Sequence, residues 1–204
     1  CAPDLRGHGA GPPADLAVTR MEDYADDVVA VARDLARPLV LMGWSMGGLA
    51  ALMAAPRLGA RAVVGLAPST PARKRDPAAP LRMGTFGPEV YGITRRDPDD
   101  QPAMEDLDRE ERVVALASLG PESQLARDER AAGIVVENLS CPLLIVTGSA
   151  DRQWPRSRYD DLPLPADDLV AEGASHWGLV LSRKALPGLG PAGLEWLASR
   201  AHLY

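Results

Sequence analysis

Short apolar runs recur along the chain, and stretches with a helical pattern separate them. The runs at 38–42, 62–66 and 142–148 show no alternation of polar and apolar residues, and a weaker run spans 168–172. Unbroken apolar runs of this length are typical of strands in a parallel sheet that is covered on both faces. We therefore predict buried parallel strands at these positions.

Helices are predicted around these strands. The first begins with Thr19 and Glu22 at the spacing of a capping box and ends before Pro38. Its expected inward face consists of Tyr24, Val28, Val31 and Leu35. Further helices are expected at 47–55, 102–119, 122–137 and 191–203. The residues expected to face inward on the helices 102–119 and 191–203 are Val113, Leu116, Ala117, Leu194, Leu197 and Ala201.

The alternation of strands and helices indicates an α/β fold, a mostly parallel sheet with helices on both faces. The pattern is interrupted after Pro68, where proline, arginine and aspartate dominate as far as about Asp100. We interpret 69–138 as a mainly helical cap, inserted into a domain that 1–68 and 139–204 form together. Long insertions of this kind are usually functional or mobile.

Composition fits one globular domain and excludes several classes of partner. The chain has 204 residues, 46% of them hydrophobic, and its 22 Lys and Arg against 28 Asp and Glu give a net charge of -6. Phosphate binding needs a basic patch, so we expect no nucleic-acid partner. We expect no membrane association and a cytoplasmic location, since no apolar run has spanning length and no export leader opens the chain. The cysteines, Cys1 and Cys141, provide no disulfide framework.

The segment Gly43-Trp44-Ser45-Met46-Gly47-Gly48 lies between the strand 38–42 and the helix 47–55. A serine at the apex of such a turn is held in strained backbone geometry, and flanking glycines let neighbouring backbone approach closely. The turn would expose the Ser45 hydroxyl above the unpaired N–H groups of a helix N-terminus, which favour negative charge. The alternative is a glycine-rich turn whose serine only caps the helix.

A nucleophilic serine needs a histidine base and an acid that orients this base. Asp151 directly follows the strand 142–148, and His176 follows the strand 168–172. Because the carboxyl ends of parallel strands meet at one edge of a sheet, we expect Ser45, Asp151 and His176 to lie together.

Other histidines and acids compete for these roles. His8 is expected to brace its loop beside ion-paired Asp4 and Arg6, and His202 is expected at the surface. The acids that compete with Asp151 are Asp160, Asp161, Asp167 and Asp168, all in or beside the polar segment that leads into the last strand.

These motifs resemble those of the α/β-hydrolases. Gly43–Gly47 resembles the family's nucleophile elbow, the turn carrying Asp151 its acid loop, and Gly173–Gly178 its histidine loop. The segment Asp4–Gly9 is similar to the loop after the family's fourth strand, so that the resemblance spans almost the whole chain.

The resemblance implies a role for each motif. Ser45 would be the nucleophile, His176 the general base and then acid, and Asp151 its orienting partner. The Met46 N–H would donate to the oxyanion, and neither a metal nor an organic cofactor would take part. Family members place further strands before the Asp4 loop and take a second oxyanion donor from there. We therefore expect an N-terminal segment of the same gene product to complete the sheet.

Candidates for the substrate pocket flank the motifs or lie in the insertion. They are Trp44, Trp177, Met83, Phe86 and Tyr91. Ordinary packing is the alternative for the two tryptophans, and a small core within the insertion is the alternative for the others. The basic residues 73–75 would attract an anionic substrate or simply be solvated.

The first functional hypothesis is a serine hydrolase that cleaves a small ester, lactone or thioester through an acyl-Ser45 intermediate. The second keeps the same triad for acyl transfer, cyclisation or cofactor-free perhydrolysis. The third, from another class, is a catalytically inactive binding or scaffold protein of the same fold. The partner is a small acyl substrate in the first two.

Overall fold

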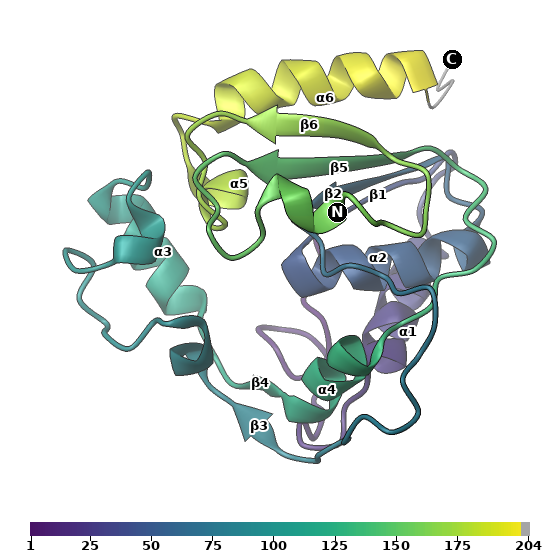
Figure 1. The fold of residues 1–204 in the computed structure, drawn as a ribbon, viewed down its shortest axis with the longest axis horizontal. Coiled ribbons are helices and arrows are strands. Elements are labelled where there is room, and N and C mark those ends of the chain that lie inside the picture. Colours follow the sequence, from purple (N-terminus) through teal and green to yellow (C-terminus); the bar gives the residue numbers. More distant parts are fainter. Residues whose placement is uncertain (201–204) are drawn as a thin grey trace.

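The computed structural model describes residues 1–200, and a four-stranded sheet lies at its centre. The strands are β1 (Val40–Trp44), β2 (Ala62–Leu66), β5 (Leu143–Gly148) and β6 (Asp167–Ala171). All neighbouring strands are parallel, in the order β1-β2-β5-β6, so their carboxyl ends lie at one edge (Figure 1). The predicted strands are confirmed, although the first begins at Val40 rather than at residue 38.

Helices cover both faces of this sheet. They are α1 (Met21–Ala32), α2 (Ser45–Leu58), α5 (Gly178–Leu181) and α6 (Leu186–Arg200). Val63 and Leu143 pack in one cluster with α1 and α2, whereas Val64 and Leu144 pack with α5 and α6. Because successive strand residues face opposite ways, this alternation shows a sheet buried on both sides and confirms the predicted fold class.

The segment 69–138 lies along the carboxyl edge and one flank of the sheet (Figure 1). Its elements are β3 (Thr85–Phe86), η1 (Pro88–Tyr91), η2 (Pro102–Met104), α3 (Arg109–Ser118), β4 (Glu122–Ser123) and α4 (Gln124–Ala132). β3 and β4 pair in an antiparallel ribbon, and α4 contacts α1. Leu116 of α3 belongs to a separate small core, which packs against Trp177 and Leu181.

Several helix details differ from the predictions. The capping box of α1 lies one residue later than expected, since the Asp23 carboxylate accepts from the Arg20 N–H at 2.8 Å. The inward face of α1 is built on Met21, Tyr24, Ala25, Val29 and Ala32, while Val31 and Leu35 are exposed. The apolar spacing therefore predicted the wrong face in part, because the small side chains Ala25 and Ala32 are buried where α1 packs closely against α2.

The helix predicted at 102–119 is also shorter than expected. It begins after Asp108, whose carboxylate accepts from the Glu111 N–H at 2.9 Å, and a short 3-10 turn precedes it. Val113 of α3 and Leu194 of α6 were both predicted to face inward, but they are 45% and 68% exposed. Both helices lie at the margin of the molecule, where only one narrow stripe meets other residues. Ala201 and His202 lie outside the described residues.

The N-terminal loop is fastened to α1. Arg6 donates to Asp27 at 2.7 Å and to Asp23 at 3.0 Å, and these carboxylates raise the pKa of Arg6. The expected ion pair within the loop is wrong for Asp4, which accepts the Ala10 N–H at 2.9 Å instead. The loop is thus held by α1 rather than by its own charges.

β1 is an edge strand within residues 1–200, because it pairs with β2 alone. Its Met42 side chain is 63% exposed, although the strand consists of apolar residues. The expectation that a further segment pairs with this edge stays a prediction.

Candidate active site

Ser45 stands where β1 becomes α2, and its φ of 52° is in the left-handed region that side chains rarely adopt. A Cβ on Gly43 would lie 2.3 Å from the Gly47 carbonyl oxygen, and one on Gly48 would lie 2.5 Å from Pro68 Cβ. A Cβ on Gly47 would meet nothing within 4 Å. Glycines were expected to be needed at both 43 and 47, two residues before and after Ser45. The close approach of the backbone instead needs glycine at 43 and 48.

Asp151 follows β5, His176 follows the neighbouring strand β6, and the two side chains meet beyond the ends of these strands. His176 Nδ1 lies 2.7 Å from Asp151 Oδ2, and Asp151 is 4% exposed. Its other oxygen accepts the N–H groups of Gln153 at 2.9 Å and Trp154 at 2.8 Å. Burial alone would raise the pKa of Asp151, but the contact with His176 and these backbone donors lower it below its ordinary value. Asp151 therefore stays a carboxylate that can orient the histidine.

Three of the four competing acids have other partners. Asp160 and Asp168 accept from Arg156 at 2.8 Å and 3.0 Å, and Asp167 accepts from the Trp196 indole at 2.7 Å. Of the acids considered, the structure brings Asp151 to His176.

Two tryptophans hold the histidine loop. The Trp44 indole N–H donates to the His176 carbonyl oxygen at 2.9 Å, and the rings of these residues lie 5.0 Å apart. Trp154 stacks against the other side of the site, with its ring 6.4 Å from that of His176. The ring of His176 is thus fixed through its Nδ1 atom, its own backbone and its neighbours.

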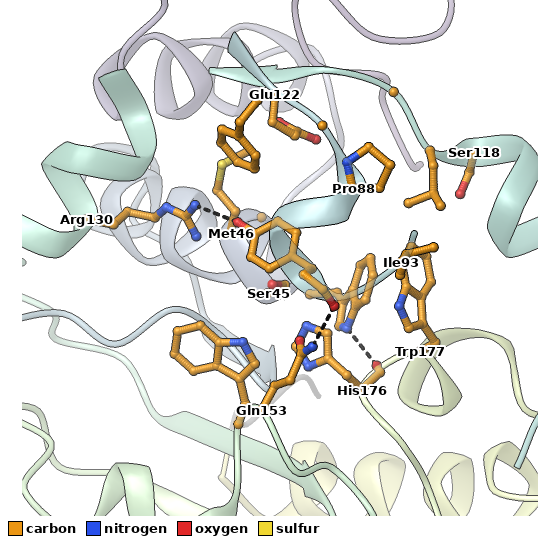
Figure 2. A pocket seen from close by; sticks show the side chains of 18 residues that line it. Ser45, Met46, Pro88, Ile93, Ser118, Glu122, Arg130, Gln153, His176 and Trp177 are labelled. Atoms are coloured by element: carbon orange, nitrogen blue, oxygen red, sulfur yellow. Dashed lines mark hydrogen bonds between the residues drawn. The ribbon is translucent and has the colours of Figure 1, made fainter. Parts of the chain in front are cut away.

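A cavity of about 270 Å³ opens over this cluster (Figure 2). Its lining includes Ser45, Met46 and His176. Four of the five predicted pocket residues, namely Trp44, Trp177, Phe86 and Tyr91, also line it. Met83 does not line the cavity, and its side chain is 74% exposed, because it lies ahead of β3 on the outside of the segment.

Sequence reasoning missed other residues of the site. Trp154 follows Asp151 by three positions, so its place in the acid loop was a usable signal. Arg130 and Glu122 line the cavity from α4 and β4, and no motif marked them. Asp106 accepts the Ser175 N–H at 3.0 Å, which ties the histidine loop to the segment 69–138. Such contacts across long sequence separations leave no local pattern.

Glu122 lines the cavity, and it forms a partly buried pair with His8. His8 Nε2 lies 3.2 Å from Glu122 Oε1, and His8 Nδ1 lies 2.9 Å from the Arg6 carbonyl oxygen. Because both ring nitrogens face acceptors, the protonated ring is favoured, and Glu122 raises the pKa of His8. His8 thus braces its loop, as expected, and does so against β4.

Among the described residues, no group of three or more His, Cys, Asp or Glu side chains is arranged to hold a metal ion. No helix within residues 1–200 is long and apolar enough to cross a membrane.

Comparison with known families agrees with this geometry. A family model described as the alpha/beta hydrolase family matches residues 1–186. The chain belongs to the alpha/beta hydrolase family. Membership in this family supports hydrolase activity. No curated protein gives a significant match to this alpha/beta hydrolase.

Solved structures share the fold of this hydrolase at low sequence identity. Tomato methylketone synthase I is 17% identical with a TM-score of 0.67, and the match covers 96% of this chain and 84% of the synthase. A methylesterase from Arabidopsis is 18% identical with a TM-score of 0.64, with 95% and 86% covered. A thermophilic esterase from Thermogutta terrifontis is 22% identical with a TM-score of 0.61, with 96% and 78% covered.

Proposed function

We propose that this alpha/beta hydrolase is a serine hydrolase that cleaves a small ester, lactone or thioester through an acyl-Ser45 intermediate. One observation carries the proposal: Ser45 has a φ of 52° and faces the same cavity as His176, which Asp151 contacts at 2.7 Å. A strained serine beside an oriented histidine is the arrangement that nucleophilic acyl transfer needs. A serine that only caps a helix would need neither the strain nor the histidine.

The tautomer of His176 follows from its contact. Because Asp151 is a carboxylate, Nδ1 carries the proton that lies between them, and Nε2 is left as the basic nitrogen. Nε2 would take the Ser45 proton during attack and return it to the leaving group. Asp151 then stabilises the charged ring without being protonated itself.

The oxyanion would lie at the N-terminus of α2. This helix begins at Ser45, so the Met46 N–H belongs to the first turn, where N–H groups have no partner within the helix. Such donors and the helix dipole stabilise negative charge that develops on the substrate oxygen. Removal of one such donor typically costs about a hundredfold in kcat.

The cavity limits the size of the substrate. Its volume of about 270 Å³ is near the lower end of ligand pockets, and aromatic side chains form much of its wall. A short acyl group fits such a cavity better than a long chain. The proposal is therefore for small esters or thioesters rather than lipids.

Kinetics with a panel of 4-nitrophenyl esters and thioesters of increasing acyl length test the proposal. We expect turnover that falls for long chains and is lost by about a thousandfold or more in Ser45→Ala and His176→Ala, with Arg33→Gln as an exposed control. Addition of an amine, an alcohol or hydrogen peroxide to the assay would reveal acyl transfer or perhydrolysis instead of hydrolysis. Substrate binding without turnover in the wild type would favour the inactive binding protein and contradict the proposal.

A further inference from the structure

We propose that Arg130 recognises a carboxylate on the substrate, so that the preferred substrates are acyl compounds with a second, anionic carboxyl group. The inference rests on the proposed function of Ser45, because Arg130 lines the same cavity. It assigns a substrate class to a site that would otherwise accept any short acyl group.

Arg130 lies near the end of α4 and reaches the wall of the cavity. Figure 2 shows Arg130 and Trp177 on opposite sides of Ser45, with the guanidinium directed inward. Its Nη1 donates to Ser69 Oγ at 2.9 Å, and its Nη2 donates to the Tyr91 hydroxyl at 3.3 Å. Ser69 in turn donates its N–H to the Ser45 carbonyl oxygen at 2.8 Å. The guanidinium is therefore fixed relative to the nucleophile.

The partners of Arg130 are neutral, and its charge has no counter-ion among residues 1–200. Within residues 1–200, no carboxylate oxygen lies within 4.0 Å of the Arg130 guanidinium, and its buried Nε has no acceptor. A partly buried cation with an unsatisfied donor is unfavourable unless an anion approaches it. Arginine cannot escape this cost by deprotonation, because its pKa lies above the physiological range.

One acidic side chain faces the cavity, and a histidine lies beside it. Among the described residues that line the cavity, Glu122 is the acidic one. His8 lies 3.2 Å from Glu122, and this carboxylate raises the pKa of His8. Glu122 therefore contacts His8 and not Arg130, whose charge stays without a counter-ion among residues 1–200.

More positive charge gathers behind Arg130. Arg130 also lines a second hollow, together with Lys74, Arg75, Arg158 and Asp76. Arg158 lies over the Trp154 ring at 4.1 Å, and Trp154 belongs to the wall of the catalytic cavity. The local excess of positive charge would attract an anion toward this side of the cavity.

The donors that remain on Arg130 suit a carboxylate. A guanidinium has five N–H groups in one plane, and the contacts with Ser69 and Tyr91 use one on Nη1 and one on Nη2. The second hydrogens on these nitrogens are available to a planar acceptor. Two oxygens of a carboxylate match this fork, whereas a neutral ester or methyl group offers no charge to it.

The first test compares two substrates of equal acyl length, the 4-nitrophenyl monoester of adipic acid and 4-nitrophenyl hexanoate. We expect the wild type to prefer the adipate ester in kcat/KM by roughly tenfold or more. Arg130→Gln should remove this preference, so that the ratio of the two kcat/KM values falls to about one. Arg33→Gln, which removes an exposed charge at the end of α1, and Arg130→Lys should retain most of it.

The second test does not depend on turnover. In Ser45→Ala, binding of adipate is followed by the fluorescence of Trp44, Trp154 and Trp177, which line the cavity, with dimethyl adipate as the neutral comparison. We expect adipate to bind more tightly than its dimethyl ester, and Arg130→Gln in this background to abolish the difference.

The outcomes separate the two claims. Equal kcat/KM for the two esters in the wild type, or a preference that survives in Arg130→Gln, overturns the inference. Absence of Ser45-dependent turnover with both esters would overturn the proposed function instead, and the fluorescence arm would still decide on Arg130. If Arg130→Gln fails to fold, the substrate ratio of the wild type decides.

Discussion

Ser45 keeps its positive φ because the residues around it leave the turn no room to relax. The backbone at Gly43 approaches Gly47, and Gly48 lies against Pro68 on the loop after β2. The Ser69 N–H then holds the Ser45 carbonyl oxygen at 2.8 Å. Strain of this kind costs on the order of 1–3 kcal/mol and persists only where neighbouring structure imposes it.

Alanine substitutions at the adjacent Gly47 and Gly48 should show which of them the close packing of this turn requires. A Cβ at Gly48 would lie 2.5 Å from Pro68 Cβ, so we expect Gly48→Ala to lower the free energy of unfolding by about 1–3 kcal/mol. Gly47→Ala is the matched control, since its Cβ meets nothing within 4 Å and alanine favours a helix. Chemical denaturation measures both. Equal loss of stability in the two variants would contradict this packing.

At the scale of elements, the histidine loop depends on the segment 69–138. Asp106 accepts the Ser175 N–H at 3.0 Å, and Glu111 of α3 accepts the Arg183 N–H at 2.8 Å. A Cβ on Gly178 would clash with the Asp106 carboxylate, so the two segments are in direct contact. The position of His176 is thus set from both sides, by β6 and by the residues before α3.

Asp106→Ala should therefore displace His176, the proposed base. We expect kcat to fall by about tenfold while KM changes little, because the substrate does not touch Asp106. Asp99→Ala, at an exposed carboxylate of the same segment, serves as the control. Steady-state kinetics give both constants. A rise in KM at unchanged kcat would assign Asp106 to binding rather than to positioning.

The pair of His8 and Glu122 joins the N-terminal loop to β4 and should depend on pH. Because the folded chain raises the pKa of His8 above its unfolded value of about 6.5, this pair stabilises fully below that value. The contribution is lost as the pH rises through the folded pKa. We expect His8→Gln to lower the free energy of unfolding by about 1 kcal/mol near about pH 5.5 and by less near about pH 9.

Urea unfolding of wild type and His8→Gln across this range measures the effect. Glu122→Gln should remove the same pH dependence, because it removes the carboxylate that favours the charged ring. A difference between wild type and His8→Gln that grows with pH would contradict the assigned ion pair.

The elements differ in how far their sequences specify them. The runs at β2 and β5 were predicted almost to the residue, because both faces of these strands are buried and nearly every position is apolar. The faces of α3 and α6 were wrong at Val113 and Leu194, since helices at the margin bury few residues and spacing alone cannot choose among them.

The residues of the candidate site also differ in how far the sequence indicates them. Ser45, Asp151 and His176 stand at strand ends, where topology brings them together, so local motifs could indicate them. Arg130, Asp106 and Trp154 gain their places through contacts between distant segments. No period or motif encodes such contacts.

At the scale of the molecule, the unpaired edge of β1 predicts a further strand. Within residues 1–200, β1 pairs with β2 alone, and its exposed Met42 would be covered by a neighbour. We expect the gene product to include an N-terminal segment that pairs with β1, whether continuous or cleaved. Intact mass and N-terminal sequencing of the protein purified from its source measure this. A single active monomer that starts at Cys1 would contradict the prediction.

Formation of a covalent bond to Ser45 is the central claim for the whole molecule. Ser45 lines the same cavity as His176 and Met46, so a substrate bound there would lie next to its hydroxyl. The most direct measurement is mass spectrometry of the intact chain and its peptides after reaction with a fluorophosphonate. We predict one adduct, located on Ser45, absent in Ser45→Ala and strongly slowed in His176→Ala. An unlabelled wild-type chain, or an adduct on another residue that persists in Ser45→Ala, would contradict the account.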